Sequence, residues 1–417
     1  MTVHVRQRAD LTHKYNRTSG RHGWLRLTPA YSVKVVDEII GSWPHGTHVF
    51  DPFSGTATTP LCAVSQGYAA TAIDINPFLI WLGRAKVAVY REQDIEETRQ
   101  MVGLLPDIIA SKKETEAVSA LPPLYNIERW WDQNALHFLS RLKSGIDAYS
   151  EHGSAVHTLL LIAFCRTMMS LSNASFDHQS MSFKAADDSD CLQMSLYEAD
   201  TDNEFVHIFR QDVENVLQTA AVNPGAAAEI IAGDSRAIEH CLTQTYDLVV
   251  TSPPYPNRMS YIRELRPYMY WLGYLKDARE AGELDWQAIG GTWGIATSRL
   301  LQWESSSDTP YPAYFSGIIA RIASAENANG LLLARYVEKY FADMWLHLKS
   351  VVSLLTTGGE VHYIVGNSTF YNVLLPVEQI YRDMLLELGL TDVSVRVLRK
   401  RNSKKELFEY EVCGLKQ

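Results

Sequence analysis

The chain has 417 residues, of which 46% are hydrophobic and 21% charged, and this balance excludes a largely disordered protein. Its length allows two domains, or one large domain with a long insertion. The net charge of −10 argues against a protein that coats nucleic acid non-specifically, because such binding needs many basic residues to neutralise phosphates.

Positive charge gathers near both ends of the chain, against its global sign. The basic residues of these stretches are Arg6, Arg8, Lys14, Arg17, Arg21 and Arg26, and Arg396, Arg399, Lys400, Arg401, Lys404 and Lys405. Two solvated faces would have this composition, and so would two surfaces that contact nucleic acid. The sequence leaves both interpretations open.

The five cysteines are scattered, without a Cys-x-x-Cys pair, so the sequence indicates neither a disulfide framework nor a zinc site. The chain has no charged-then-apolar leader at Met1, and its longest apolar run, around 159–164, is too short to cross a bilayer. We therefore expect a protein of the reducing cytoplasm, with no membrane contact and no metal.

The first predicted element is a helix that starts near Thr28 and Pro29, after a basic and aromatic segment from residue 11. Its apolar residues recur at helical spacing, which predicts one buried face. These residues are Val33, Val35, Val36, Ile39 and Ile40.

A short strand ending at Asp51 is predicted to lead into a loop with Phe53, Gly55 and Thr56, and then into a helical run at 61–66. A strand, loop and helix in this order present backbone N–H groups and a helix N-terminus to a charged ligand.

The next predicted strand, 69–74, ends at Asp74 and is followed by Asn76 and Pro77. An acid about 20 positions after a glycine loop, at the end of the second strand, is placed to accept hydrogen bonds from ribose hydroxyls. An aspartate that only caps the following helix would occupy the same place.

From residue 91 to 225 the alternation of strand and helix stops, which predicts a mostly α-helical insertion. We expect Trp130 and Trp131 to pack in its core. The predicted domains are therefore 1–90 with 226–417, interrupted by 91–225. The helical stretches of the insertion are 92–100, 111–116, 136–142 and 157–171.

The sheet resumes with a strand before Asp234, and with a second strand at 246–250 that stops at Ser252-Pro253-Pro254-Tyr255. Two prolines make this loop rigid and remove backbone donors. Ser252 and the Pro253 carbonyl can accept the protons of a planar amino group, while Tyr255 stacks on its face. An ordinary turn with a packed tyrosine is the alternative.

Arginines alternate with aromatic residues after this loop. They are Arg258, Tyr261, Arg263, Arg266, Tyr268, Tyr270, Trp271 and Tyr274. Arginines with interleaved rings can contact phosphates and unstacked bases, although rings at helical spacing are more often core. Arg258, Tyr261 and Arg263 are the candidate substrate-binding residues.

An amphipathic helix is predicted at 336–355, ended by Gly358 and Gly359 and followed by a fifth strand at 360–368. Two apolar runs at 393–398 and 408–412, on either side of a basic turn, predict a hairpin.

Three separated segments resemble S-adenosylmethionine-dependent DNA amino-methyltransferases in wording and order. They are the segment 11–40, the loop Asp-Pro-Phe-x-Gly-x-x-Thr-Thr at 51–59, and the Ser-Pro-Pro-Tyr motif. The resemblance covers residues 11–80 and 228–417, without the insertion. It implies an α/β fold with a doubly wound, Rossmann-like methyltransferase sheet and a C-terminal β-hairpin.

The resemblance also implies S-adenosylmethionine as the cofactor and assigns roles to single residues. The cofactor-binding residues would be Thr28, Asp51, Phe53, Gly55, Thr56, Asp74, Asn76 and Asp234, and the catalytic residues Ser252, Pro253, Pro254 and Tyr255. The family usually has a second glycine where this chain has Ala57. We expect alanine to be tolerated there, because it costs little unless φ is positive.

We therefore expect a site-specific DNA methyltransferase that acts on the exocyclic amino group of a flipped base. Ser252 favours cytosine N4, because adenine N6 enzymes of the family more often carry Asp or Asn there. A C5-cytosine mechanism is disfavoured, since it needs a cysteine after a proline and the chain has none.

The alternatives are an adenine N6 enzyme, an RNA base methyltransferase, and an inactive nucleic-acid-binding subunit with the same fold. The expected partners are double-stranded DNA and a cognate restriction nuclease or defence-system subunit. The insertion would be a target-recognition or DNA-clamping lobe, with plain scaffold as the alternative.

Overall fold

The computed structural model describes residues 8–12, 15–27, 31–111, 121–175, 182–183, 198–256, 260–291, 295–304, 308–325, 329–401 and 406–417. Two candidate site residues, Thr28 and Arg258, lie outside these ranges, as does residue 112 onward of the predicted helical stretch 111–116.

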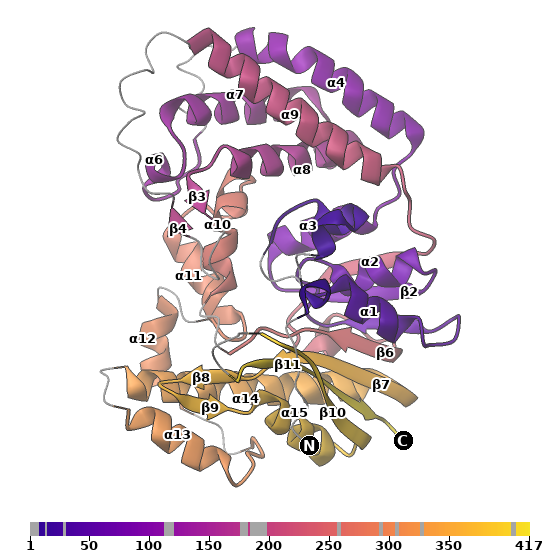
Figure 1. The fold of residues 1–417 in the computed structure, drawn as a ribbon, viewed down its shortest axis with the longest axis vertical. Coiled ribbons are helices and arrows are strands. Elements are labelled where there is room, and N and C mark those ends of the chain that lie inside the picture. Colours follow the sequence, from indigo (N-terminus) through magenta and orange to yellow (C-terminus); the bar gives the residue numbers. More distant parts are fainter. Residues whose placement is uncertain are drawn as a thin grey trace.

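A seven-stranded sheet with the order β10-β11-β7-β6-β1-β2-β5 organises the fold (Figure 1). Its strands are β1 (His48–Asp51), β2 (Ala69–Asp74), β5 (Ala228–Ala232), β6 (Tyr246–Thr251), β7 (Leu355–Gly366), β10 (Thr391–Lys400) and β11 (Phe408–Leu415). Strands β5, β2, β1, β6 and β7 are parallel, and β11 runs antiparallel to both of its neighbours. The predicted doubly wound sheet with a C-terminal hairpin is confirmed.

Both faces of the sheet are covered, because successive side chains of a strand point to opposite faces. Val49 of β1 packs into a core with α1 (Val33–Ile40) and α2 (Thr58–Ser65). Its neighbour Phe50 packs into a second core with α14 (Gly330–Leu354) and α15 (Val377–Glu387). All five apolar residues predicted on α1 are buried.

The boundary between α14 and β7 differs from the prediction. The helix ends at Leu354, and the strand begins at the next residue, so Gly358 and Gly359 lie inside β7. The pairing of β6 with β7 shifts register there, and a Cβ on Gly359 would lie 2.9 Å from the carbonyl oxygen of Asp247. Gly359 therefore permits a close approach of the two strands. The predicted helix end at residue 355 lies within one residue of the observed end, whereas the predicted start of the strand at residue 360 was wrong, because β7 already begins at Leu355.

The residues between α3 (Pro77–Val87) and β5 form a group of helices. They are α4 (Glu92–Ser111), α6 (Ile127–Trp130), α7 (Gln133–Tyr149), α8 (Ala155–Ser170) and α9 (Glu198–Ala220), with the short strands β3 (Ala174–Ser175) and β4 (Ser182–Phe183). Figure 1 shows α4, α7, α8 and α9 packed together, away from the sheet. Trp130 and Trp131 are buried in their core, as predicted.

Helix α10 (Tyr261–Trp271) joins the core of this helical group, which explains the aromatic run after Tyr255. The Trp271 ring meets the Trp131 ring edge-on at 5.8 Å, and Tyr268 stacks on Phe78 of α3 at 5.2 Å. Tyr268, Tyr270 and Trp271 are therefore core residues and are not available to bases.

The remaining elements are short. They are η1 (Ala9–Leu11), η2 (Tyr15–Thr18), η3 (Gly20–Gly23), η5 (Ile238–His240), α11 (Ala278–Gln287), α12 (Ile295–Gln302), α13 (Phe315–Ala323), β8 (Ser368–Phe370) and β9 (Val373–Leu375). Within the described ranges, no helix combines the length and the apolar character that a bilayer crossing requires.

Candidate active site

Predicted site residues on three neighbouring strands lie at one edge of the sheet. Asp51 ends β1, Asp74 ends β2 and Thr251 ends β6, and these strands are parallel neighbours. The chain leaves β1 toward β2 on one side and later returns to β6 on the other. This reversal is a topological switch point, where open α/β sheets bind their ligands.

Asp51 is completely buried beneath this edge. Its Oδ1 accepts hydrogen bonds from the Thr251 hydroxyl at 2.6 Å and from the Phe53 backbone N–H at 3.0 Å. Among the described residues, none donates to Oδ2. Burial raises the pKa of Asp51 to about 7. A buried acid with an unpartnered oxygen suits a cationic ligand group.

The loop after β1 has left-handed backbone at both Gly55 (φ +49°) and Ala57 (φ +59°). The expectation that alanine costs little at position 57 was therefore wrong, because a Cβ in this region of φ is strained by about 1–2 kcal/mol. A glycine at position 57 would avoid the strain that this chain retains. The surrounding turn sets the φ angle of a single residue, and the local sequence does not indicate this angle.

Asp74 ties this loop to β2. Its Oδ2 accepts from the Gly55 N–H and its Oδ1 from the Asn76 N–H, each at 2.8 Å, while burial raises its pKa to about 6. Each carboxylate oxygen keeps lone-pair capacity for ribose hydroxyls. Asn76 caps α3 through a hydrogen bond from the Phe78 N–H to its Oδ1 at 3.0 Å, so its side chain already has a structural function.

Lys86 is a contributor to the site that the sequence did not reveal. Its side chain is buried, and its Nζ donates to the Thr56 carbonyl at 2.8 Å. Burial lowers the pKa of Lys86 to about 7. A lysine on a helix is normally exposed, and the signal that could have found it is its place among the apolar residues of α3.

His347 of α14 connects the loops after β1 and β5. Its ring packs against Phe53 at 4.6 Å between centroids, and its Nδ1 lies 3.1 Å from the Ser235 carbonyl. Burial lowers the pKa of His347 to about 3, so the ring is neutral. Nδ1–H therefore donates to Ser235, and Nε2 accepts from the Tyr363 hydroxyl at 2.9 Å.

Asp234 is already paired by its own loop. Arg236 donates from Nε to Oδ1 at 3.0 Å and from Nη2 to Oδ2 at 2.7 Å, and it also reaches Asp343 at 3.1 Å. Although burial opposes it, these hydrogen bonds lower the pKa of Asp234. Any contact of Asp234 with the cofactor's adenine has to use the remaining lone pairs, and this role stays a prediction.

The loop after β6 is held by two neighbouring elements. The Ser252 hydroxyl donates to the Ile364 carbonyl of β7 at 3.0 Å. The Pro254 carbonyl accepts from the hydroxyl of Tyr340, a buried residue of α14, at 2.8 Å. Because the Ser252 proton is engaged, its oxygen faces further partners as an acceptor.

Tyr255 is the most constrained residue of this loop. Its hydroxyl donates to Glu409 Oε1 at 2.9 Å, and the Arg401 guanidinium carbon lies 4.9 Å from its ring centroid. Its backbone N–H donates to the Tyr261 hydroxyl at 3.3 Å. The structure thus brings Tyr261 to the motif but leaves the Arg263 side chain exposed on α10.

The site can be tested for its fit to S-adenosylmethionine on the chain's own atoms. Asp51 Oδ2 and Ser54 Oγ are buried and unpartnered among the described residues, within the strand and loop that precede α2. The buried carboxylate of Asp51 can pair with the ammonium and sulfonium charges of the cofactor, and the Asp74 carboxylate can accept hydrogen bonds from its ribose hydroxyls. The residues fit this cofactor.

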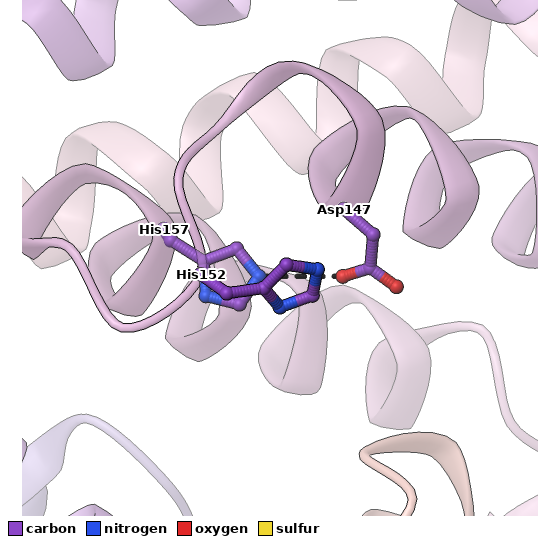
Figure 2. Close-up of side chains that lie close together, drawn as sticks. All are labelled: Asp147, His152 and His157. Atoms are coloured by element: carbon purple, nitrogen blue, oxygen red, sulfur yellow. Dashed lines mark hydrogen bonds and ion pairs between the residues drawn. The ribbon is translucent and has the colours of Figure 1, made fainter.

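A second cluster of ionisable side chains lies far from this edge, in the helical group (Figure 2). The ligand atoms of Asp147, His152 and His157 lie within 4.8 Å of one another. However, Lys143 pairs with Asp147 Oδ2, and His157 Nε2 lies 3.3 Å from Oδ1. An ammonium bound to the carboxylate opposes a cation, so we interpret the cluster as an ion pair within α7 and a hydrogen-bonding contact of the same carboxylate with His157 of α8.

The strand order, with one antiparallel strand beside the last parallel one, and the acids at the carboxyl edge define the methyltransferase form of the doubly wound fold. No protein-family model matches the chain.

Three curated relatives are Type II methyltransferases. M.BsoBI of Geobacillus stearothermophilus is 19% identical, over 98% of this chain and 86% of its own length. M.MvaI of Kocuria varians is 20% identical, over 90% and 81%. M.AvaI of a Nostoc species is 21% identical, over 94% and 84%. These relatives support a methyltransferase activity for this chain and confirm S-adenosylmethionine as its cofactor.

Two solved structures are also similar to the chain. TrmN from Thermus thermophilus has a TM-score of 0.30 and 9% identity, over 92% of this chain and 48% of its own. The rRNA methyltransferase aviRa from Streptomyces viridochromogenes has a TM-score of 0.29 and 10% identity, over 92% of this chain and 86% of its own.

Proposed function

We propose that the protein is a site-specific DNA methyltransferase that modifies the exocyclic amino group of a flipped base, with cytosine N4 as the target. The observation that carries the proposal is the orientation of Ser252. Its only proton is donated to the Ile364 carbonyl, so its oxygen can serve a substrate only as an acceptor. An acceptor is what an amino group with two N–H bonds requires.

The lone pair of an aromatic amine is delocalised into the ring, so the nitrogen is a poor nucleophile. Ser252 Oγ and the Pro253 carbonyl would accept hydrogen bonds from its two N–H groups and favour a pyramidal nitrogen. S-adenosylmethionine, when bound, supplies a methyl group that is already activated on a sulfonium sulfur. With the cofactor held by Asp51 and Asp74, the base nitrogen would displace the sulfur from the methyl carbon, and one amino proton would then leave to solvent.

The chain's part in this step is chiefly to orient the two reactants. Asp51 would hold cationic groups of the cofactor, and Asp74 its ribose hydroxyls. Tyr255 would receive the flipped base by stacking on it. The choice of cytosine N4 is supported by Ser252, since the adenine enzymes of the family more often carry Asp or Asn at that position.

We further propose that the helical group between α3 and β5 is the target-recognition or DNA-clamping lobe. Helix α10, which follows the motif, packs into the core of this lobe and thereby couples it to the site. The Type II designation of the relatives supports a role beside a cognate restriction nuclease.

The test is transfer of labelled methyl from S-adenosylmethionine to unmethylated duplex DNA, with nucleoside analysis of the product. Ser252→Ala is run alongside, with Ser260→Ala, an N-cap serine of α10, as the matched serine control. N4-methylcytosine that is lost only in Ser252→Ala supports the proposal. N6-methyladenine keeps the mechanism but overturns the base. Transfer to RNA alone, or cofactor binding without any transfer, overturns the function.

A further inference from the structure

Tyr255 is gripped by two residues of the C-terminal hairpin, far from it in sequence. Glu409 of β11 accepts the hydrogen bond of its hydroxyl at 2.9 Å. Arg401, at the end of β10, lies against its ring with the guanidinium carbon 4.9 Å from the centroid, within the range of a cation–π contact. One edge and one face of the ring are thereby occupied.

Glu409 is a fixed acceptor. It is 6% exposed, and Arg399 donates from Nε to its Oε2 at 2.7 Å and from Nη2 to its Oε1 at 3.1 Å. The paired guanidinium compensates the buried charge and sets the plane of the carboxylate. Burial, and then the charge of Glu409, raise the pKa of Tyr255 well above its usual range, so the phenol stays a donor.

Arg401 is fixed as well. Its Nη1 donates to the Asn367 carbonyl at 3.0 Å, and its backbone N–H donates to the Leu407 carbonyl at 2.7 Å. The Asn367 side chain binds the other side of the turn, accepting from the Phe408 N–H at 2.8 Å. The guanidinium is therefore held in place before any substrate arrives.

Gly366 of β7 makes room for this stack. It pairs directly with Glu409 across the two strands. A Cβ at Gly366 would overlap the Arg401 guanidinium and lie 3.0 Å from Cε2 of Tyr255. The Arg401 guanidinium and the Tyr255 ring therefore pack over Gly366, where only a glycine fits.

We propose that Glu409 and Arg401 are positioning residues for the base-stacking face of Tyr255, so that the hairpin orients one half of the motif while Ile364 orients the other. Arg401 backs one face of the ring, so a planar base would stack on the opposite face. This inference rests on the proposed function, because it assigns the ring to a flipped base.

The test is a double-mutant cycle on the full chain, read as the single-turnover rate of methyl transfer to duplex DNA at saturating cofactor. Glu409→Gln and Tyr255→Phe each lower this rate, by about tenfold for the loss of a charged hydrogen bond. If Glu409 acts through the Tyr255 hydroxyl, the double variant is no slower than the slower single variant. The dissociation constant of the cofactor stays unchanged in all three.

Glu411→Gln is the matched control. Glu411 lies on the same strand, is 5% exposed and also pairs with an arginine, but it contacts His362 in place of Tyr255. It is expected to keep the wild-type rate. Rates that multiply in the double variant, or an equal loss in Glu411→Gln, reduce the hairpin to scaffold and overturn the inference.

Arg401→Met and Arg401→Lys provide a second route that does not depend on Glu409. Methionine keeps the length of the side chain but removes the cation, and it is expected to lower the rate by about tenfold. Lysine restores part of that loss. An unchanged rate in Arg401→Met overturns the inference, whereas wild-type protein that binds cofactor but transfers no methyl group overturns the proposed function itself.

Discussion

The ammonium group of Lys86 lies 2.8 Å from the carbonyl oxygen of Thr56, inside the structure that carries the candidate cofactor loop. A buried lysine without a carboxylate is costly, and among the described residues Lys86 donates to the backbone of the loop. This hydrogen bond holds the turn between β1 and α2 in place. The burial of Lys86 makes the stability of this region depend on pH.

Lys86→Met should remove a pH dependence of stability. Burial lowers the pKa of Lys86 to about 7 in the folded chain, below its unfolded value, so the unfolded chain binds more protons between these values. The contribution of Lys86 to stability is therefore present above its unfolded pKa and is lost as pH falls toward about 7. Denaturant titrations at pH 7, 8 and 9 should show the free energy of unfolding of wild type rising relative to the variant. A constant difference would contradict the buried, titrating lysine.

Asp51→Asn should weaken cofactor binding by roughly 10- to 100-fold, the value of a hydrogen bond to a charged group. Because burial raises the pKa of Asp51 to about 7, wild-type affinity for a cationic cofactor should fall about tenfold per pH unit below that pH. Calorimetry at pH 5.5 to 8 on both proteins separates this titration from that of the cofactor itself. Ser54→Ala, which removes the neighbouring hydroxyl, should keep the pH dependence, and a flat wild-type profile would exclude Asp51 as the partner.

Substitutions at the two left-handed positions of the loop should have opposite signs. Ala57→Gly relieves about 1–2 kcal/mol of backbone strain and loses about 0.8 kcal/mol from one buried methyl group, so it should raise stability by up to about 1 kcal/mol. Gly55→Ala introduces the same strain and should lower stability by about 1–2 kcal/mol. Chemical denaturation measures both. Equal signs would show that the loop relaxes out of the left-handed region.

Arg21→Met should destabilise the fold without altering the salt dependence of DNA binding. The guanidinium is buried and donates to five acceptors, which are the carbonyls of Lys86, Ala88, Thr219 and Ala220 and the side-chain oxygen of Asn223. Leaving these groups unpaired should cost about 3 kcal/mol or more. Arg8→Ala, at an exposed arginine that pairs with Asp10, should leave stability nearly unchanged. A reduced salt slope in Arg21→Met would instead indicate a phosphate contact.

The sequence predicted those parts of the structure that local patterns encode. The apolar runs of β1, β2 and β6 predicted buried parallel strands, and the Ser252 motif was placed correctly at a strand end. Contacts between distant segments were not predictable in this way. The packing of helices and strands turns the Lys86 side chain inward and stacks Arg401 on Tyr255. The spacing of residues in the sequence predicts neither contact.

The local sequence also gave wrong predictions where the packing of distant backbone segments determines the environment of a residue. Two consecutive glycines after a helix usually mark its end, yet Gly358 and Gly359 lie inside β7, and Gly359 permits the close approach of this strand to β6. Arg21 was grouped with a basic stretch that could face solvent or nucleic acid, but its side chain is buried in the fold. In both cases the local sequence does not show which distant segments pack around the residue.

The contact between Tyr255 and Glu409 has a consequence for synthesis of the protein. The ribosome makes the loop after β6 about 150 residues before it makes the strand that grips its tyrosine, as the separation of 154 positions requires. A nascent chain can therefore complete the turn around Asp51 and Asp74 while Tyr255 still lacks its hold. The order of translation delays assembly of the motif until β11 has been made and has left the ribosomal exit tunnel.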